Sequence, residues 1–281
     1  MNKRISIILA IAVIVVSCTE KINLKLDSTF TRLVVDGHIK SDTMAYTINL
    51  TKTSDYFSNV PAPREVNAKV SLTDGTSTFP LSETVPGQSG IYQTDPKFAG
   101  TIGKDYTLHI SLAEVIAGTT EYSASSNLIG VTRLDSIQVV LNADMGKDGV
   151  WEVKVYAQDP PGSINYYMVN LYRNNQLWSD TITKVSVTDN QFFAGRYIDG
   201  AEVFRINNSH LWETLYPGDT IMVELSAITK EYFDFINQVK QVGFSIPFFT
   251  GPPANVQGNV SNNGIGFFAA YSSSFAKTIV K

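Results

Sequence analysis

Apolar and polar residues alternate along most of this chain beyond its first thirty residues. In the run 46–51 every second residue is apolar, and the residues between are Thr or Asn. Runs of the same period occur at 69–73 and 106–112, and the turn-forming pair Asp74-Gly75 follows the first of these two. Because alternate side chains of a strand point to opposite faces, this period of two predicts half-buried β-strands joined by short turns.

The second half of the chain continues the same pattern. Its strand-like runs are residues 136–141, 150–157, 166–172, 181–187, 202–206 and 220–228. Short strands separated by turns are typical of β-sandwiches. We therefore expect a mainly β protein with two β-sandwich domains, Ig-like or transthyretin-like, the N-terminal one at residues 32–132 and the C-terminal one at 133–281.

One segment breaks the alternation and has helical spacing instead. Tyr232, Ile236 and Val239 are three or four residues apart, which places them on one face of a helix. Thr229 stands just before the segment, where a hydroxyl can cap the first turn. The sequence therefore predicts one amphipathic helix, residues 230–242, that packs against a sheet near the C-terminus.

A long segment rich in Gly, Pro and Asn, residues 244–266, follows the predicted helix. Loops of this length are uncommon in compact domains and are often functional. Phe248 and Phe249 lie near its start. Since a few aromatic residues usually dominate a binding interface, we expect this pair to be partly exposed and to contact a partner. The alternative is that both rings close the core beneath the loop.

The start of the chain is apolar without alternation. Residues 5–16 are apolar except for one Ser, and Lys3 and Arg4 precede them. Twelve residues are too few to span a bilayer as a helix, which takes about 20. A short apolar run after basic residues is typical of a secretory signal peptide, which we assign to residues 1–17.

The signal ends in a sequence that points to lipid attachment. Val15-Val16-Ser17-Cys18 resembles a bacterial lipobox, and Cys18 is the only cysteine of the chain. We therefore expect Cys18 to become the acylated N-terminus, carrying chains such as palmitate that hold the protein to a membrane. Residues 18–31 are then the lipidated tether and a first strand.

Composition and charge exclude some classes of protein. Apolar residues make up 43% of the chain, which is enough for a packed core and unlike a disordered protein. The formal net charge of -4 and the pI near 5.4 disfavour binding to nucleic acid.

The sequence holds no linear motif for catalysis or metal binding. The three histidines are far apart, and no Cys or His pair has the spacing of a zinc site. Residues 142–149 alternate oxygen-bearing side chains but lack the Gly and Glu positions of a calcium loop. We therefore expect no catalytic residue, no metal and no cofactor. A carboxylate pair of the glycoside hydrolase kind leaves no linear motif, so a hydrolase on this scaffold stays open as an alternative.

Three loop signatures suggest a family. They are Asp159-Pro160-Pro161-Gly162-Ser163-Ile164-Asn165-Tyr166-Tyr167, Tyr216-Pro217-Gly218-Asp219-Thr220, and Pro253-Ala254-Asn255-Val256-Gln257-Gly258-Asn259-Val260 with the following residues 263–268. Together with the lipobox and Val34-Val35-Asp36-Gly37, they resemble the domain of unknown function 4249 family, lipoproteins of Bacteroidota-type Gram-negative bacteria. The motif residues look structural: Asp159, Pro160, Pro161, Gly162, Asn165, Asn255, Gly258 and Asn259.

The resemblance implies a place and a role, and it supplies no catalytic residue. It implies an outer-membrane protein held by the acylated Cys18 and working as an accessory to a TonB-dependent transporter. Surface lipoproteins of these bacteria often carry an acidic run after the lipidated Cys, but here Glu20 is the only acidic residue in the segment 19–26. Surface and periplasmic display therefore both stay open. We expect a lipid-anchored binding or interaction module, with two alternatives: the carboxylate-based hydrolase, or a purely structural envelope lipoprotein.

Overall fold

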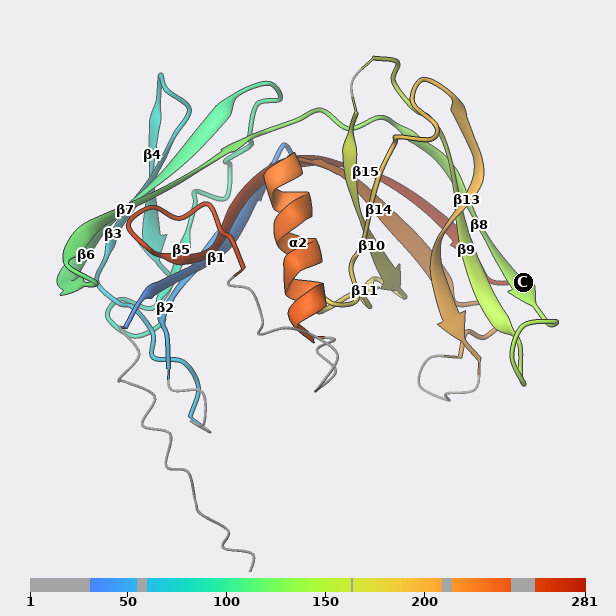
Figure 1. Ribbon diagram of the computed structural model, residues 1–281, viewed down its shortest axis with the longest axis horizontal. Helices are drawn as coiled ribbons and strands as arrows, with labels where there is room; N and C mark the ends of the chain where they lie inside the picture. Colours follow the sequence, from blue (N-terminus) through green and yellow to red (C-terminus); the bar gives the residue numbers. More distant parts are fainter. Residues whose placement is uncertain (1–30, 55–59, 163, 209–213, 244–255) are drawn as a thin grey trace, which may run out of the picture. The chain divides into compact units, whose positions relative to one another are not determined.

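A computed structural model describes residues 31–54, 60–162, 164–208, 214–243 and 256–281 (Figure 1). Its strands are β1 (Leu33–Lys40), β2 (Thr47–Lys52), β3 (Lys69–Thr73), β4 (Thr78–Glu83), β5 (Ile91–Gln93), β6 (Asp105–Ile116), β7 (Thr119–Asn127), β8 (Leu134–Asn142), β9 (Val150–Gln158), β10 (Tyr166–Arg173), β11 (Gln176–Leu177), β12 (Ser186–Asp189), β13 (Tyr197–Asn207), β14 (Thr220–Ile228) and β15 (Ile265–Ile279). Its helix is α2 (Lys230–Gly243). The predicted mainly β class with one helix near the C-terminus is therefore confirmed for the described residues.

The strands form a large sheet and a small one. The large sheet has 12 strands in the order β11-β10-β14-β15-β1-β2-β5-β4-β3-β6-β7, with β12 pairing beside β10. The small sheet has three strands, β13-β9-β8. Neighbouring strands pair antiparallel, except that β1 and β15 run parallel. A parallel pair needs a long connection between its strands, and here nearly the whole chain lies between them.

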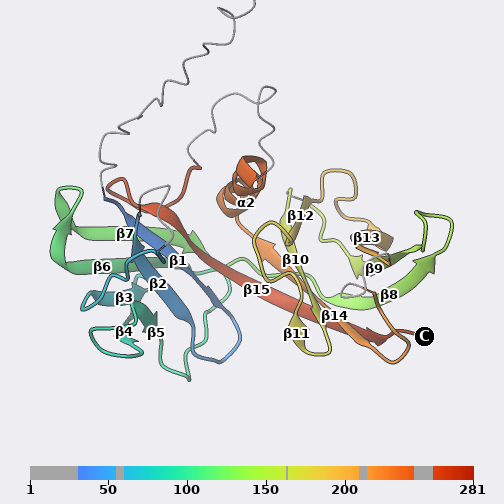
Figure 2. The same ribbon diagram turned by 90° about the horizontal axis from the view of Figure 1, so that it is seen from below.

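The last strand, β15, links the two halves of the chain. Its first part, from Ile265 to Tyr271, pairs with β1, and its second part, from Ser272 to Ile279, pairs with β14. Figure 2 shows it running from one group of strands to the other. The strand β15, from the C-terminal half of the chain, therefore pairs with β1 of the N-terminal half. The domain boundary near residue 132 stays a prediction.

The period of two in β15 distributes its side chains between separate apolar clusters. Phe268 and Ala270 join the cluster enclosed by the strands from β1 to β7. The intervening residues Phe267, Ala269 and Tyr271 face the other way, into the cluster beneath α2. A further cluster fills the space between the small sheet and strands β10 and β14. One alternating strand thus stabilises the packing on both of its faces.

The helix forms where the sequence predicts it, over Lys230–Gly243. Thr229 caps it, because its Oγ1 accepts the N–H of Tyr232 at 3.3 Å. Tyr232 packs on the ring of Phe267 at 4.9 Å between centroids, and Ile236 is buried. At the other end of α2, the Lys240 ammonium donates to the carbonyl oxygen of Val185. The apolar face of the helix therefore covers the large sheet, as expected for an amphipathic helix.

Candidate functional site

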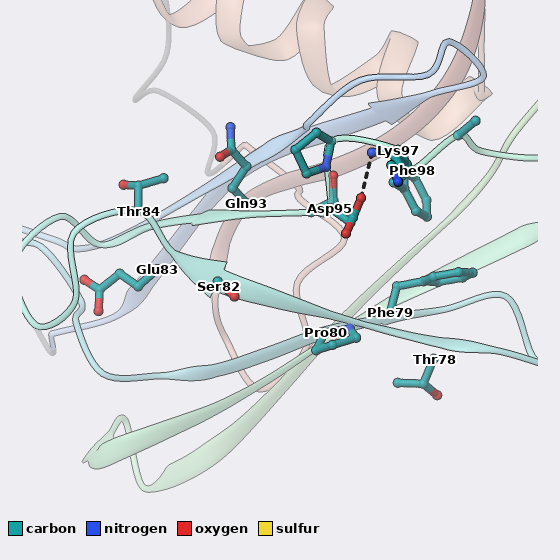
Figure 3. Close-up of a pocket in the computed structure, with 13 residues that line it drawn as sticks. Thr78, Phe79, Pro80, Ser82, Glu83, Thr84, Gln93, Asp95, Lys97 and Phe98 are labelled. Carbon is teal, nitrogen blue, oxygen red and sulfur yellow. Dashed lines mark hydrogen bonds between the residues drawn. The ribbon is translucent and has the colours of Figure 1, made fainter.

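A cleft of about 890 Å³ lies beside β4. We call it the β4 cleft. Its lining, drawn in Figure 3, is Thr78, Phe79, Pro80, Ser82, Glu83, Thr84, Gln93, Thr94, Asp95, Pro96, Lys97, Phe98 and Ala99. The cleft opens because β4 pairs with β5 only at Ser82 and Glu83, whereas its other edge pairs with β3 along Thr78–Leu81.

The chain turns away from β4 after Gln93, and hydrogen bonds fix that turn. Thr94 accepts the N–H of Tyr46 on its hydroxyl at 2.9 Å and donates its own N–H to the carbonyl of Tyr46 at 3.0 Å. Asp95 then accepts the N–H of Lys97 on its carboxylate at 2.8 Å (Figure 3). Phe98 donates its N–H to the carbonyl of Asp95 at 2.9 Å. Both walls of the cleft are therefore held in place by the fold.

Aromatic rings form the apolar end of the cleft. The rings of Phe79 and Phe98 meet edge to face, with centroids 5.1 Å apart. Phe98 also contacts the rings of Tyr46 and Tyr106, at 6.1 and 6.2 Å, and is only 6% exposed. This end of the cleft is thus continuous with the apolar core, as in pockets that exist before a ligand arrives.

The two carboxylates of the cleft are both engaged by loop backbone. Glu83 accepts the N–H groups of Gly87 at 2.8 Å and Gly90 at 2.9 Å. Burial alone would raise the pKa of Glu83, but the backbone N–H groups outweigh it and hold the pKa below its ordinary value. Asp95 accepts the backbone N–H of Lys97. Glu83 therefore stays ionised at neutral pH and is a poor proton donor, which disfavours general acid catalysis.

Pro80 shapes the open edge of β4. Proline has no N–H, so it is tolerated in a strand mainly where the strand has a free edge. Among the described strands, only β3 pairs with β4 over Thr78–Leu81. A proline at this position leaves the edge poor in donors and resists pairing with a foreign strand. The edge thus favours a ligand that donates hydrogen bonds over a chain that extends the sheet.

A buried ion pair lies on the large sheet away from the β4 cleft. The Lys40 ammonium is 2.8 Å from the Glu224 carboxylate, and the Glu224 side chain is 2% exposed. Glu224 also accepts from the hydroxyls of Tyr172 and Ser273, each at 2.7 Å. Burial alone would raise the pKa of Glu224, but the Lys40 charge and these hydrogen bonds lower it below its ordinary value. Because every partner comes from a strand of the sheet, the cluster is suited to join β1, β15, β14 and β10.

This ion pair is not among the features that the sequence patterns predict. A signal was present, since Glu224 interrupts an otherwise apolar run in β14. A buried carboxylate needs a partner, but its partner Lys40 is 184 residues away, and no local pattern identifies it.

Asp159 of the first family signature is completely buried. Its carboxylate accepts the hydroxyl of Tyr167 at 2.7 Å, the Nδ2 of Asn190 at 2.8 Å and the N–H of Gly195 at 3.0 Å. The N–H of Asn165 in turn donates to the Oδ1 of Asn190 at 2.8 Å. These contacts tie the loop after β9 to the turn between β12 and β13.

Pro160, Pro161 and Gly162 continue that loop as a turn between β9 and β10. Gly162 has a φ of 117°, a conformation that other residues rarely adopt. The first signature thus combines a fixed turn with a buried carboxylate, and these contacts give it a role in positioning loops.

The third signature holds β15 against its neighbours. The Oδ1 of Asn259 accepts the N–H of Phe268 at 2.9 Å, and its Nδ2 donates to the carbonyl of the same residue at 2.7 Å. Gly258 leaves room for the backbone, because a Cβ there would lie 1.9 Å from the carbonyl oxygen of Gly266. Cys18, Phe248, Phe249 and Asn255 lie outside the described residues.

The described residues contain neither a metal-binding cluster nor a membrane-spanning helix. Within those ranges, no three His, Cys, Asp or Glu side chains gather where they could hold a metal ion. In the same part of the chain, no helix has the length and apolar character needed to cross a membrane.

A family model matches most of this chain. The family model described as "Domain of unknown function (DUF4249)" matches residues 19–275. A search of the curated proteins found no match for this chain. The matched range includes the described strands β1 to β14, the helix α2 and most of β15. The chain therefore belongs to the domain of unknown function 4249 family.

Proposed function

We propose that this protein is a lipid-anchored binding module of the outer membrane, accessory to a TonB-dependent transporter and without catalysis. The lipobox-like segment ending at Cys18 supports the anchor, and the family resemblance supports the setting. The structural observation that carries the binding role is the β4 cleft. It is about 890 Å³ in volume, its walls are fixed by hydrogen bonds, and an aromatic pair forms its apolar end.

Binding explains the cleft better than hydrolysis does. A hydrolase needs one carboxylic acid with a raised pKa near a second carboxylate. Glu83 has a lowered pKa, and Asp95 accepts a backbone N–H within its own turn. A purely structural envelope role leaves a preformed cleft of this size without use. The donor-poor edge at Pro80 favours a ligand rich in hydroxyl or amide donors.

Affinity purification from solubilised outer membranes tests the role. The tagged full-length protein is expected to retain a TonB-dependent transporter, identified by mass spectrometry. The control is the Cys18→Ser variant, which should leave the membrane fraction or persist as an unprocessed precursor. A processed Cys18→Ser protein that fractionates like wild type would contradict the lipid anchor. Absence of a transporter from the wild-type eluate would contradict the accessory role.

Phe248 and Phe249 are proposed to contact the partner. The double variant Phe248→Ala/Phe249→Ala is expected to keep the wild-type melting temperature and to lose the co-purified transporter. If both rings are core residues, the variant unfolds at a much lower temperature, since each Phe→Ala change in a core costs about 3–5 kcal/mol. That result would remove the pair from the proposed contact.

A further inference from the structure

The turn between β12 and β13 presents an aromatic ring to solvent. We call residues 190–196 the Phe192 turn. The side chain of Phe192 is 85% exposed, more than any other large apolar residue of the described chain. Its neighbour Phe193 packs instead against the apolar cluster of the small sheet. A single exposed apolar residue is ordinary, so a binding role for Phe192 must rest on the structure around the ring.

The backbone of the Phe192 turn is held rigidly. The buried Asp159 carboxylate accepts the Gly195 N–H, and the Nε2 of Gln158 donates to the Gly195 carbonyl at 3.2 Å. Phe193 donates its N–H to the carbonyl of Asn190 at 2.9 Å. A ring on a fixed backbone loses little conformational entropy on binding, which is a property of effective binding anchors.

A cavity lies next to the Phe192 turn. This Pro160 cavity has a volume of about 310 Å³. Its lining is Asn127, Ile129, Gly130, Pro160, Ile164, Asn165, Tyr166, Tyr167, Ala227, Ile228, Thr229, Lys230 and Glu231. Pro161 connects it to the turn, since a Cβ on Gly195 would lie 3.3 Å from the Cα of Pro161. An exposed ring and a cavity large enough for a ring therefore adjoin on one surface.

Charges of opposite sign accompany the ring and the cavity. Arg196, which ends the Phe192 turn, is exposed, and so is Glu231 at the rim of the cavity. Lys230 also lines the cavity, but its ammonium forms an ion pair with Asp234 one turn along α2. The ring therefore has a basic neighbour and the cavity an acidic one.

We infer that this surface docks a second copy of the chain, with Phe192 of each copy entering the Pro160 cavity of the other and Arg196 of each copy facing Glu231 of the other. A surface that carries both a protruding ring and a complementary cavity satisfies both contacts at once under a two-fold rotation. The inference goes beyond the proposed function and does not depend on a transporter or on the β4 cleft.

Sedimentation velocity of the full mature protein in density-matched detergent tests the inference. Wild type is expected to be a dimer at micromolar concentration, and Phe192→Ala to raise the dimer dissociation constant about thirtyfold, as for the loss of an interface hot spot. Phe192→Ala should keep the melting temperature of wild type. The matched control is Phe193→Ala, which should lower the melting temperature because its ring packs on the core.

Charge reversal tests the pairing of Arg196 with Glu231. Arg196→Glu alone and Glu231→Arg alone should each weaken the dimer, and the double variant should restore it. A wild-type protein that stays monomeric at tens of micromolar would overturn the inference. So would a dimer that Phe192→Ala leaves unchanged. The inference would also be overturned if wild type is monomeric and a different protein co-purifies with wild type but not with Phe192→Ala. That result would assign the surface to this other partner.

Discussion

The β4 cleft and the loops around Asp159 both contain a carboxylate that fixes a loop, but the two carboxylates differ in burial. In both regions a carboxylate accepts backbone N–H groups from a loop: Glu83 from Gly87 and Gly90, and Asp159 from Gly195. The difference is burial, because Asp159 is fully buried, whereas Glu83 is half-buried and Asp95 is exposed to solvent. Water can replace a lost partner at the cleft but not at Asp159. The β4 cleft can therefore tolerate different ligands, whereas Asp159 requires its hydrogen-bond partners in the protein to stay in place.

The largest effect is expected from removing the buried carboxylate. Asp159→Ala leaves the Tyr167 hydroxyl, the Asn190 amide and the Gly195 N–H without their acceptor, which should lower the free energy of unfolding by about 3–5 kcal/mol. The matched control, Asp95→Ala in the cleft, should stay within about 1 kcal/mol of wild type. Chemical denaturation followed by circular dichroism measures both. Equal effects of the two variants would contradict the contrast between the regions.

A smaller loss is expected where the third signature brings backbones close together. In Gly258→Ala the new methyl group meets the Gly266 carbonyl oxygen, so the backbone at residue 258 or the start of β15 must shift, at a cost of about 1–3 kcal/mol. Gly130→Ala is the control, since its Cβ would meet only the side chain of Ile102, at 3.1 Å, and Ile102 is exposed and free to move. Thermal unfolding should separate the two variants, and equal melting temperatures would contradict the close approach.

The pH dependence of stability should report on Glu224. Its pKa in the folded protein lies below the ordinary value of 4.5, so the ionised form stabilises the fold above that pH. The stabilisation should disappear as the pH falls through the lower, folded pKa. Glu224→Gln removes this contribution, and the difference in unfolding free energy between wild type and Glu224→Gln should therefore shrink below about pH 4.5. A difference that stays constant down to pH 3 would show that the charge of Glu224 is not stabilising.

The smallest change in stability is expected at the cleft itself. Ser82 is exposed and lines the β4 cleft, so Ser82→Trp should fill part of the space and change the free energy of unfolding by no more than about 0.5 kcal/mol. A ligand captured from native membranes should then be lost. Thr76→Trp, in the exposed turn between β3 and β4, is the control and should keep the ligand. Retention of the ligand by Ser82→Trp would place binding outside the cleft.

Local patterns predicted the secondary structure well, with instructive exceptions. The period of two anticipates β2, β3 and β6, and the helical spacing anticipates α2. In the run 181–187, however, residues 181–184 form a turn in which Lys184 donates its N–H to the carbonyl of Thr181 at 2.9 Å. Ile182 lies in this turn and Val185 directly after it, three residues apart rather than two, and both side chains pack against the apolar cluster beneath α2. Periodicity reports which side chains are buried more reliably than it reports the backbone conformation.

The sequence by itself determined the mainly β class, the position of the helix and the family, because these depend on neighbouring residues and short motifs. Only the tertiary structure decided that β15 pairs in parallel with β1, that Lys40 meets Glu224, and that Asp159 holds a turn about 30 residues further along the chain. The tertiary structure also decided the β4 cleft, because β5 reaches only Ser82 and Glu83 of β4 and leaves the rest of that edge unpaired with β5. Alternation in a strand encodes which face is buried but not which strand lies beside it, so contacts between distant segments are settled only when the whole chain packs.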